Sequence, residues 1–288
     1  MMPGLTGALT GAQALLIATR ALAAAGIPDP GRDARRLFSH ALGIEPGRLT
    51  LVLPDPLDVA AQSSFDALIT RRLTREPVSH LTGTRAFYGR DFIVNGAVLD
   101  PRPETETLIE VALGLPFNRV LDLGTGSGCM VLTLLAETPG ATGLGIDISA
   151  AACAVAAQNA VALGLTHRAQ FQLGNWHSGP VGRYDLIVAN PPYIAASEMA
   201  GLSPEVRDWE PRAALTDEGD GLGAYRAILQ GITDHMTPQA RLILEIGPTQ
   251  AKAVCAVVQR GGFAKAEVIQ DLDGRDRIVM AIQSKSPV

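Results

Sequence analysis

The segment VANPPY, residues 188–193, joins an apolar run to an asparagine, two prolines and a tyrosine. Proline fixes φ and has no N–H group, so a strand must end at Pro191. The Asn190 side chain and the backbone of Pro191 then offer carbonyl oxygens that can orient a planar NH2 group and stabilise charge on its nitrogen. A ring at Tyr193 can stack on such a group. We therefore predict that a planar nitrogen is held by Asn190, Pro191, Pro192 and Tyr193; a rigid turn that closes a strand is the alternative.

A glycine-rich loop, VLDLGTGSG, follows an earlier apolar run at residues 120–128. Its glycines remove Cβ atoms where the chain must turn and where a ligand must touch the backbone. The spacing is G-x-G-x-G and not the G-x-G-x-x-G of dinucleotide enzymes. We predict that the loop binds a ligand through Gly124, Thr125, Gly126, Ser127 and Gly128. A plain turn between a strand and a helix is the alternative.

Two acidic residues suggest what that ligand is. Asp122 precedes the loop, where a carboxylate suits an ammonium group better than a pyrophosphate. Asp147 ends the next apolar strand, 19 residues after Gly128, and can accept hydrogen bonds from both hydroxyls of a ribose. An adenosine-like ribose with a cationic amino-acid tail indicates S-adenosylmethionine, with S-adenosylhomocysteine as its demethylated product.

A third strand ends in LGNWHSG, residues 173–179. Here Asn175 is predicted to hydrogen-bond the adenine edge and Trp176 to cover its face. A turn asparagine beside a buried tryptophan is the alternative.

The elements that must position these residues fall into three segments. Residues 1–75 show helical periodicity, as in AQALLIATRALAAAG, and are predicted to form a small helical bundle that docks a substrate. Residues 76–103 contain an aromatic pair and an Asn-Gly signal, typical of a β-hairpin linker. Residues 104–288 alternate strands and helices, which predicts an α/β domain with a mostly parallel, doubly wound sheet and an antiparallel last strand.

Composition restricts the classes of function. The chain has 288 residues, 47% hydrophobic and 18% charged, with a net charge of −5. Residues 1–75 hold eight arginines and six acidic residues, a net +2, which leaves −7 for the remainder. A nucleic-acid surface normally needs a basic excess, so no direct nucleic-acid substrate is expected. No membrane span, signal peptide or metal-ligand spacing is seen, which predicts a cytoplasmic protein without a metal.

Together the motifs resemble those of a known family. NPPY with LDLGTGSG is similar to class I amino-methyltransferases of Rossmann-like fold, and REPVSHLTGTRAFYG, LDPRPETE, VRDWEPRAAL and LEIG resemble the peptide chain release factor N5-glutamine methyltransferases, the PrmC/HemK family. The resemblance implies methylation of the glutamine amide in the Gly-Gly-Gln motif of release factors. It also implies that Asn190 contacts both cofactor and glutamine.

The resemblance leaves some points open. Arg102, Glu104 and Glu106 lie in PRPETE, beside the cofactor or target entrance, with no individual roles assigned. Asn175 stands where the family often has aspartate, a change that removes a charge. The alternatives are an adenine-N6 nucleic-acid methyltransferase, whose target is also a planar amine, and a non-catalytic docking protein that binds the cofactor. A nicotinamide dehydrogenase is disfavoured by the glycine spacing.

Overall fold

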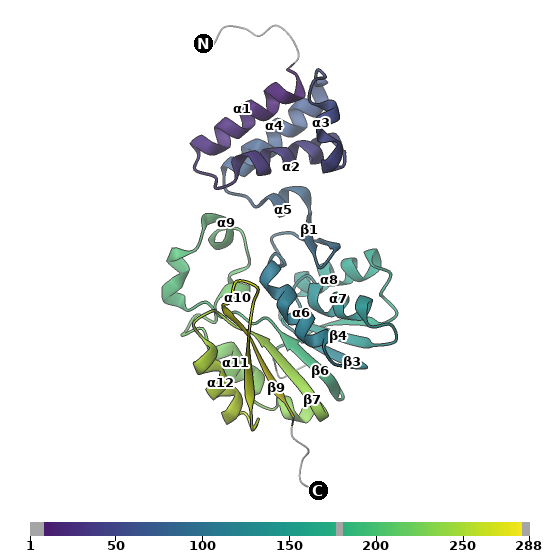
Figure 1. The fold of residues 1–288 in the computed structure, drawn as a ribbon, viewed down its shortest axis with the longest axis vertical. Coiled ribbons are helices and arrows are strands. Elements are labelled where there is room, and N and C mark those ends of the chain that lie inside the picture. The colour runs from purple at the N-terminus through teal and green to yellow at the C-terminus, as the bar shows by residue number, and fades with distance from the viewer. Residues whose placement is uncertain (1–8, 177–180, 284–288) are drawn as a thin grey trace. The chain divides into compact units, whose positions relative to one another are not determined.

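The computed structural model describes residues 9–176 and 181–283, and it divides the chain into two compact units (Figure 1). The first unit holds the described residues up to Gly83 together with Pro204–Trp209. The second holds Thr84–Ser203 and the described residues from Glu210 onward. A short stretch of the later chain therefore belongs to the N-terminal unit, and no sequence pattern predicted this.

The first unit is helical. Its elements are α1 (Gly11–Ala24), α2 (Pro30–Leu42), η1 (Pro46–Arg48), α3 (Leu49–Val52), α4 (Val59–Leu73), α5 (Val78–Thr82) and α9 (Pro204–Arg207). Helix α1 begins at a capping box in which Thr10 and Gln13 exchange hydrogen bonds, and α2 ends at Gly43 in the left-handed conformation. Phe38 and Phe65 meet edge to face, 5.0 Å between ring centroids, in its core. The helical bundle predicted for this part of the chain is confirmed.

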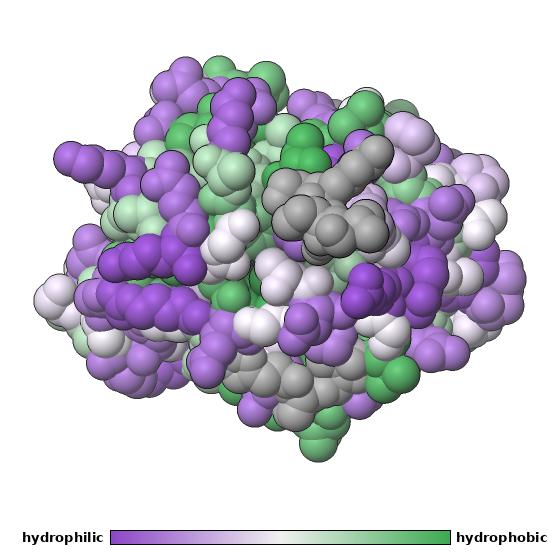
Figure 2. Space-filling view, turned by 90° about the horizontal axis from the view of Figure 1, so that it is seen from below, coloured by the Kyte–Doolittle hydropathy of each residue, from purple (hydrophilic) through white to green (hydrophobic). Residues whose placement is uncertain are grey.

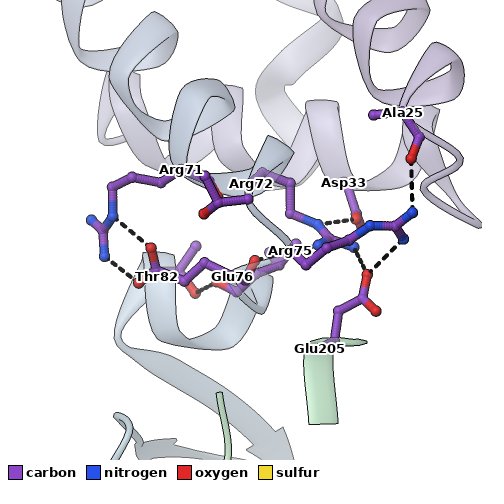
Figure 3. Close-up of polar contacts among 10 residues, drawn as sticks. Ala25, Asp33, Arg71, Arg72, Arg75, Glu76, Thr82 and Glu205 are labelled. Atoms are coloured by element: carbon purple, nitrogen blue, oxygen red, sulfur yellow. Dashed lines mark hydrogen bonds and ion pairs between the residues drawn. The ribbon is translucent and has the colours of Figure 1, made fainter. Parts of the chain in front are cut away.

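Within this unit, Glu205 of α9 lies between two arginines of the N-terminal segment (Figure 3). Arg72 donates to the Glu205 carboxylate over 2.9 Å and also to Asp33 over 2.8 Å. Arg75 donates to the same carboxylate over 3.2 Å and to the carbonyl of Ala25 over 2.7 Å. Burial opposes ionisation of Glu205, but its hydrogen bonds outweigh burial and hold its pKa below the usual value. These ion pairs attach Pro204–Trp209 to the first unit.

The second unit is built on a seven-stranded sheet in the order β5-β4-β3-β6-β7-β9-β8. The strands are β3 (Arg119–Leu123), β4 (Thr142–Asp147), β5 (Ala169–Leu173), β6 (Tyr184–Ala189), β7 (Met236–Glu245), β8 (Ala266–Gln270) and β9 (Asp276–Ile282). Strand β9 pairs antiparallel with both of its neighbours, β7 and β8, and the other adjacent strands of this sheet pair in parallel. A separate antiparallel hairpin joins β1 (Thr84–Phe87) to β2 (Arg90–Ile93). The predicted fold class is thus confirmed, including its antiparallel last strand and its hairpin.

Helices cover both faces of this sheet (Figure 1). One face carries α6 (Glu106–Leu113), α7 (Cys129–Glu137) and α8 (Ala150–Ala162), and the other carries α11 (Gly223–Leu229) and α12 (Ala251–Arg260). Side chains of β6 alternate between the two buried clusters. Leu186 and Val188 pack on the α6–α7 side, and Ile187 and Ala189 pack on the α11–α12 side. Continuous apolar runs in the sequence therefore correspond to strands buried on both faces.

Two parts of the second unit differ from expectation. The segment GLGAYRAILQGITDHM, residues 221–236, predicts a single helix. In the structure α11 ends early and a 3-10 turn, η4 (Ile232–His235), follows Gly231, whose φ of 88° interrupts the helix. Short elements in the stretch after β6 were not predicted: η3 (Ala196–Gly201) and α10 (Arg212–Leu215). Another, η2 (Pro103–Thr105), precedes α6.

No helix within residues 9–176 and 181–283 is long and apolar enough to span a membrane. On the face shown in Figure 2, hydrophilic and hydrophobic side chains are interspersed.

Candidate active site

The glycine loop connects β3 to α7 at the carboxyl end of the sheet. Gly124, Gly126 and Gly128 all have positive φ, at 73°, 54° and 78°, a conformation that side chains with a Cβ rarely adopt. The Gly124 N–H donates to the carbonyl of Ile146 on β4 over 2.8 Å. A Cβ added to Gly124 would lie 3.3 Å from the ring of Trp176, so the indole packs directly against the loop. The loop conformation thus depends on glycine for reasons visible in the structure.

The carboxyl of Asp122 is buried behind the glycine loop. Its side chain is fully buried, and Oδ2 accepts hydrogen bonds from the Thr125 hydroxyl over 2.8 Å and the Val131 N–H over 3.3 Å. Burial raises the pKa of Asp122 to about 7. The prediction of direct contact with an ammonium group is therefore wrong for this conformation, because the carboxyl lies behind the loop. Its role here is to connect the loop to the first turn of α7.

Asp147, at the end of β4, is held by backbone groups on both sides. Its Oδ2 accepts from the Gly126 N–H over 2.9 Å, and its Oδ1 accepts from the Ser149 N–H over 2.9 Å. Each carboxylate oxygen can accept a further hydrogen bond. Asp147 also lines the adjoining pocket, so its orientation is fixed while part of its hydrogen-bonding capacity stays available.

A pocket of about 310 Å³ lies beside the loop, a size typical of small-molecule sites. It brings together predicted residues from four separate strand ends: Gly124, Gly126, Asp147, Asn175, Trp176, Asn190 and Pro192. A smaller adjoining cavity of about 40 Å³ shares Gly124, Gly126 and Asn190 with the pocket, and Thr125 and Ser127 line it. Gly128 packs instead against Ala156 and Leu132.

Several lining residues were not singled out from the sequence. They come from the segment after the hairpin, from the start of α8 and from the stretch around α10: Ala97, Val98, Leu99, Ile148, Ser149, Ala152, Pro211, Ala213 and Ala214. Most are small or apolar and carry no chemistry of their own. Some of them lie inside motifs quoted from the sequence, since LDPRPETE begins at Leu99 and VRDWEPRAAL contains Pro211, Ala213 and Ala214.

The NPPY segment leaves β6 and turns at the pocket wall. Asn190 is half-buried, and its Nδ2 donates to the Thr105 hydroxyl over 3.3 Å. Pro192 lines the pocket, whereas the side chain of Pro191 is buried. The Tyr193 carbonyl accepts from Gln250 over 2.9 Å. The turn is therefore fixed on both sides of the prolines.

The Tyr193 ring is half-buried against the α11–α12 cluster and is not among the residues lining the pocket of about 310 Å³. Burial raises the pKa of its phenol to about 12. Stacking of Tyr193 on a target group stays a prediction.

The PRPETE segment, residues 101–106, contributes structural contacts around the site. Arg102 donates to both carboxylate oxygens of Glu210 over 2.6 and 2.7 Å. Burial raises the pKa of Glu210 to about 7, with Arg102 acting in the opposite direction. Glu106 accepts from the backbone N–H of Tyr88 in the hairpin over 2.8 Å. These contacts fix the entry to α6, so Arg102 and Glu106 have structural partners here.

The sheet with its antiparallel last strand, the glycine loop after β3 and the acid ending β4 define a class I S-adenosylmethionine-dependent methyltransferase. Residues 13–83 match the family model of the PrmC N-terminal domain and residues 102–203 that of the methyltransferase small domain. The chain belongs to the release factor glutamine methyltransferase family, as its relatives show.

Two relatives illustrate this membership. The release factor glutamine methyltransferase of Cereibacter sphaeroides is 55% identical over 94% of this chain and 97% of that protein. That of Rhodospirillum rubrum is 44% identical over 90% of this chain and 81% of that protein.

A crystal structure of a methyltransferase from Pyrococcus furiosus has a TM-score of 0.53 at 15% identity and covers 77% of this chain and 100% of that one. The latter likeness shows the fold.

Proposed function

We propose that this protein transfers a methyl group from S-adenosylmethionine to the side-chain amide nitrogen of the glutamine in the Gly-Gly-Gln motif of peptide chain release factors. Relatives at 55% and 44% identity over most of their length carry the name of that activity. S-adenosylhomocysteine is the second product.

The pocket residues fit the cofactor. The Asp147 carboxylate reaches the pocket with lone pairs available for ribose hydroxyls, and Trp176 provides an aromatic wall. A Cβ at Gly126 would meet no atom within 4 Å, so the loop presents bare backbone toward a ligand. Bound S-adenosylmethionine supplies an electrophilic methyl group on a sulfonium. Asp147, the glycine loop and Trp176 would hold it.

The observation that carries the proposal is the orientation of Asn190. With Nδ2 engaged by Thr105, its Oδ1 remains to accept a hydrogen bond from an NH2 group in the pocket. A second acceptor, the Pro191 carbonyl, would receive the other N–H. Two fixed acceptors orient an amide nitrogen and favour the positive charge that develops on it. Tyr193 would border the glutamine.

The three predicted segments receive complementary roles in this proposal. Residues 1–75 dock the release factor, residues 76–103 link, and residues 104–288 bind cofactor and perform the transfer. The net charge of −7 from residue 76 onward favours a protein substrate over a nucleic acid. Because translation factors act in the cytoplasm, we place the protein there.

The test is incubation of the purified protein with a release factor and isotopically labelled S-adenosylmethionine, followed by mapping of the label. Label on the glutamine of Gly-Gly-Gln is expected, and a release factor with glutamate at that position should remain unlabelled. Absence of label on the wild-type factor, or label only on adenine of added nucleic acid, would overturn the proposal.

A further inference from the structure

Thr105 occupies the N-cap position of α6 without acting as a cap. Threonine at such positions normally accepts a hydrogen bond from a backbone N–H of the first turn. Here Thr105 has helical φ and ψ of −66° and −19°, and its side chain makes no capping hydrogen bond. The residue is 2% exposed. Its buried hydroxyl is therefore available to other groups.

Two polar side chains use this hydroxyl. Asn190 donates to Thr105 Oγ1 through Nδ2 over 3.3 Å. The Glu245 carboxyl is buried on the same side of the sheet, and its interaction with the Thr105 hydroxyl acts to lower the pKa of Glu245. Glu245 ends β7, and because it follows Leu244 of the α11–α12 side, strand alternation turns it toward α6. Thr105 thus lies between the amide of Asn190 and a buried carboxyl.

The number of protons fixes the direction of these bonds. A hydroxyl has one proton to donate, and an ionised carboxylate can only accept. When the Thr105 proton points to Glu245, the Thr105 oxygen must accept from Asn190. The two ends of an asparagine amide have nearly the same shape, so only such partners decide which end faces a ligand. Here the NH2 end faces Thr105 and the carbonyl end faces away from it.

We propose that Thr105 and Glu245 form a relay that fixes the orientation of the Asn190 amide, which makes both of them positioning residues for methyl transfer. The inference rests on the proposed function, because the carbonyl of Asn190 is the group assigned to the target amide. If the Asn190 side-chain amide were turned so that its carbonyl and NH2 ends exchanged places, its NH2 group would face the target NH2 group. Two hydrogen-bond donors would then face each other.

The surroundings of Glu245 suit this role. The residue is 1% exposed, and its Oε2 has no hydrogen-bond partner among the described residues. Burial raises the pKa of Glu245 to about 7, whereas Thr105 and Arg277 of β9 act to lower it. Two smaller effects follow: Glu104 raises this pKa and Arg102 lowers it. Three further titratable groups that sense its charge are Cys129 of α7, Tyr193 after β6 and Tyr225 of α11.

Thr105→Val tests the relay because it keeps the shape and removes the hydroxyl. Thr105→Ser restores the hydroxyl, and Thr133→Val is a matched control. Thr133 is fully buried in α7 and its hydroxyl has no partner among the described residues. We expect Thr105→Val to lower kcat on a release factor about tenfold or more, on the scale of a misplaced catalytic contact. The KM of Thr105→Val for S-adenosylmethionine should stay within about twofold of the wild-type value. The kcat of Thr105→Ser and that of Thr133→Val should also stay within about twofold of wild type.

A second readout does not need turnover. The chain has five asparagines, so the Asn190 side-chain amide can be assigned by NMR in asparagine-labelled protein. Thr105→Val should shift the Asn190 NH2 signals, whereas Thr105→Ser and Thr133→Val should leave them near their wild-type positions. An unchanged Asn190 signal in Thr105→Val, or a kcat equal to that of Thr133→Val, would overturn the relay. If wild-type protein fails to methylate a release factor, the proposed function fails, and the NMR comparison still decides the relay.

Discussion

The backbone N–H of Gly126 donates to Oδ2 of Asp147 over 2.9 Å, so the acid that ends β4 is tied directly to the glycine loop after β3. Ser149 holds the other oxygen over the same distance. The carboxylate is thereby aimed before any ligand arrives, which reduces the ordering cost of binding.

Replacement of Asp147 by alanine should therefore weaken binding of S-adenosylhomocysteine by about 1–3 kcal/mol, the cost of leaving hydrogen-bonding groups without partners. Titration calorimetry measures this directly. Asp234→Ala, at an exposed position in η4, is the control and should bind normally. Equal affinity of Asp147→Ala and wild type would remove Asp147 from the ribose site.

Glu245 should make turnover depend on pH. An ionised Glu245 can only accept a hydrogen bond from Thr105, whereas a protonated carboxyl can also donate to the Thr105 oxygen in competition with Asn190. The raised pKa of about 7 means that the carboxyl becomes protonated as pH falls through that value. We expect kcat to decrease on acidification through about 7, and to do so less in Glu245→Gln, which has no proton to gain. The kcat of both proteins should be measured from about pH 6 to about pH 8.5, a range that includes this pKa. Superimposable profiles for wild type and Glu245→Gln would contradict the predicted pH dependence.

The same carboxyl should affect stability in the opposite direction. A folded-state pKa of about 7 against an ordinary value of 4.5 means that the folded protein keeps a proton which the unfolded chain has lost. The stabilisation is complete below about 4.5 and is lost as pH rises through about 7, a change of ~3 kcal/mol at 1.36 kcal/mol per pKa unit. Denaturant unfolding on either side of this window should show that Glu245→Gln loses less stability than wild type on going to the higher pH.

The docking role of the helical unit predicts an effect on one substrate only. Leu16 and Ile17 of α1 are large apolar side chains with 51% and 54% exposure. Changing both to serine should raise KM for an intact release factor several-fold, on the scale of ~1 kcal/mol for lost apolar burial. Affinity for S-adenosylhomocysteine should not change. Leu272→Ser, at a residue 97% exposed in the second unit, is the control; an unaltered KM in the double variant would place docking elsewhere.

Much of the sheet could be predicted because its strands are short apolar runs that alternate with helical patterns. Gly124 and Asp147 could be predicted to lie close together. In a parallel sheet, a loop after one strand and an acid at the end of the next strand meet at the same edge of the sheet. Asn190 and Pro192 could be placed there for the same reason.

Other features depend on tertiary contacts that no local pattern reveals. Asp122 has the sequence position of a ligand-binding acid, yet the strand alternation that carries Val120 into the α6–α7 cluster also buries Asp122 behind the loop. Glu205 is attached to Arg72, which lies 133 residues away in the sequence, and Thr105 meets Asn190 across 85 residues. Thr105 itself looked like an ordinary residue before a helix.

Asn190 carries the proposed transition-state contact. Asn190→Ala should lower kcat on a release factor by about 10²–10³, on the scale of losing one preorganised electrostatic contact, with a smaller change in cofactor affinity. Asn190→Asp keeps the shape but replaces the NH2 end with an acceptor facing the Thr105 oxygen, which already accepts from Asn190 in the wild type. We expect it to be impaired as well.

The most direct measurement is a single-turnover time course in which mass spectrometry follows methylation of the Gly-Gly-Gln peptide of an intact release factor by wild type and Asn190→Ala. One methyl group on the glutamine amide is predicted for wild type, with a rate lower by about 10²–10³ in Asn190→Ala. An unmodified glutamine with wild type, or equal rates for the two proteins, would contradict the assignment of this pocket to glutamine methylation.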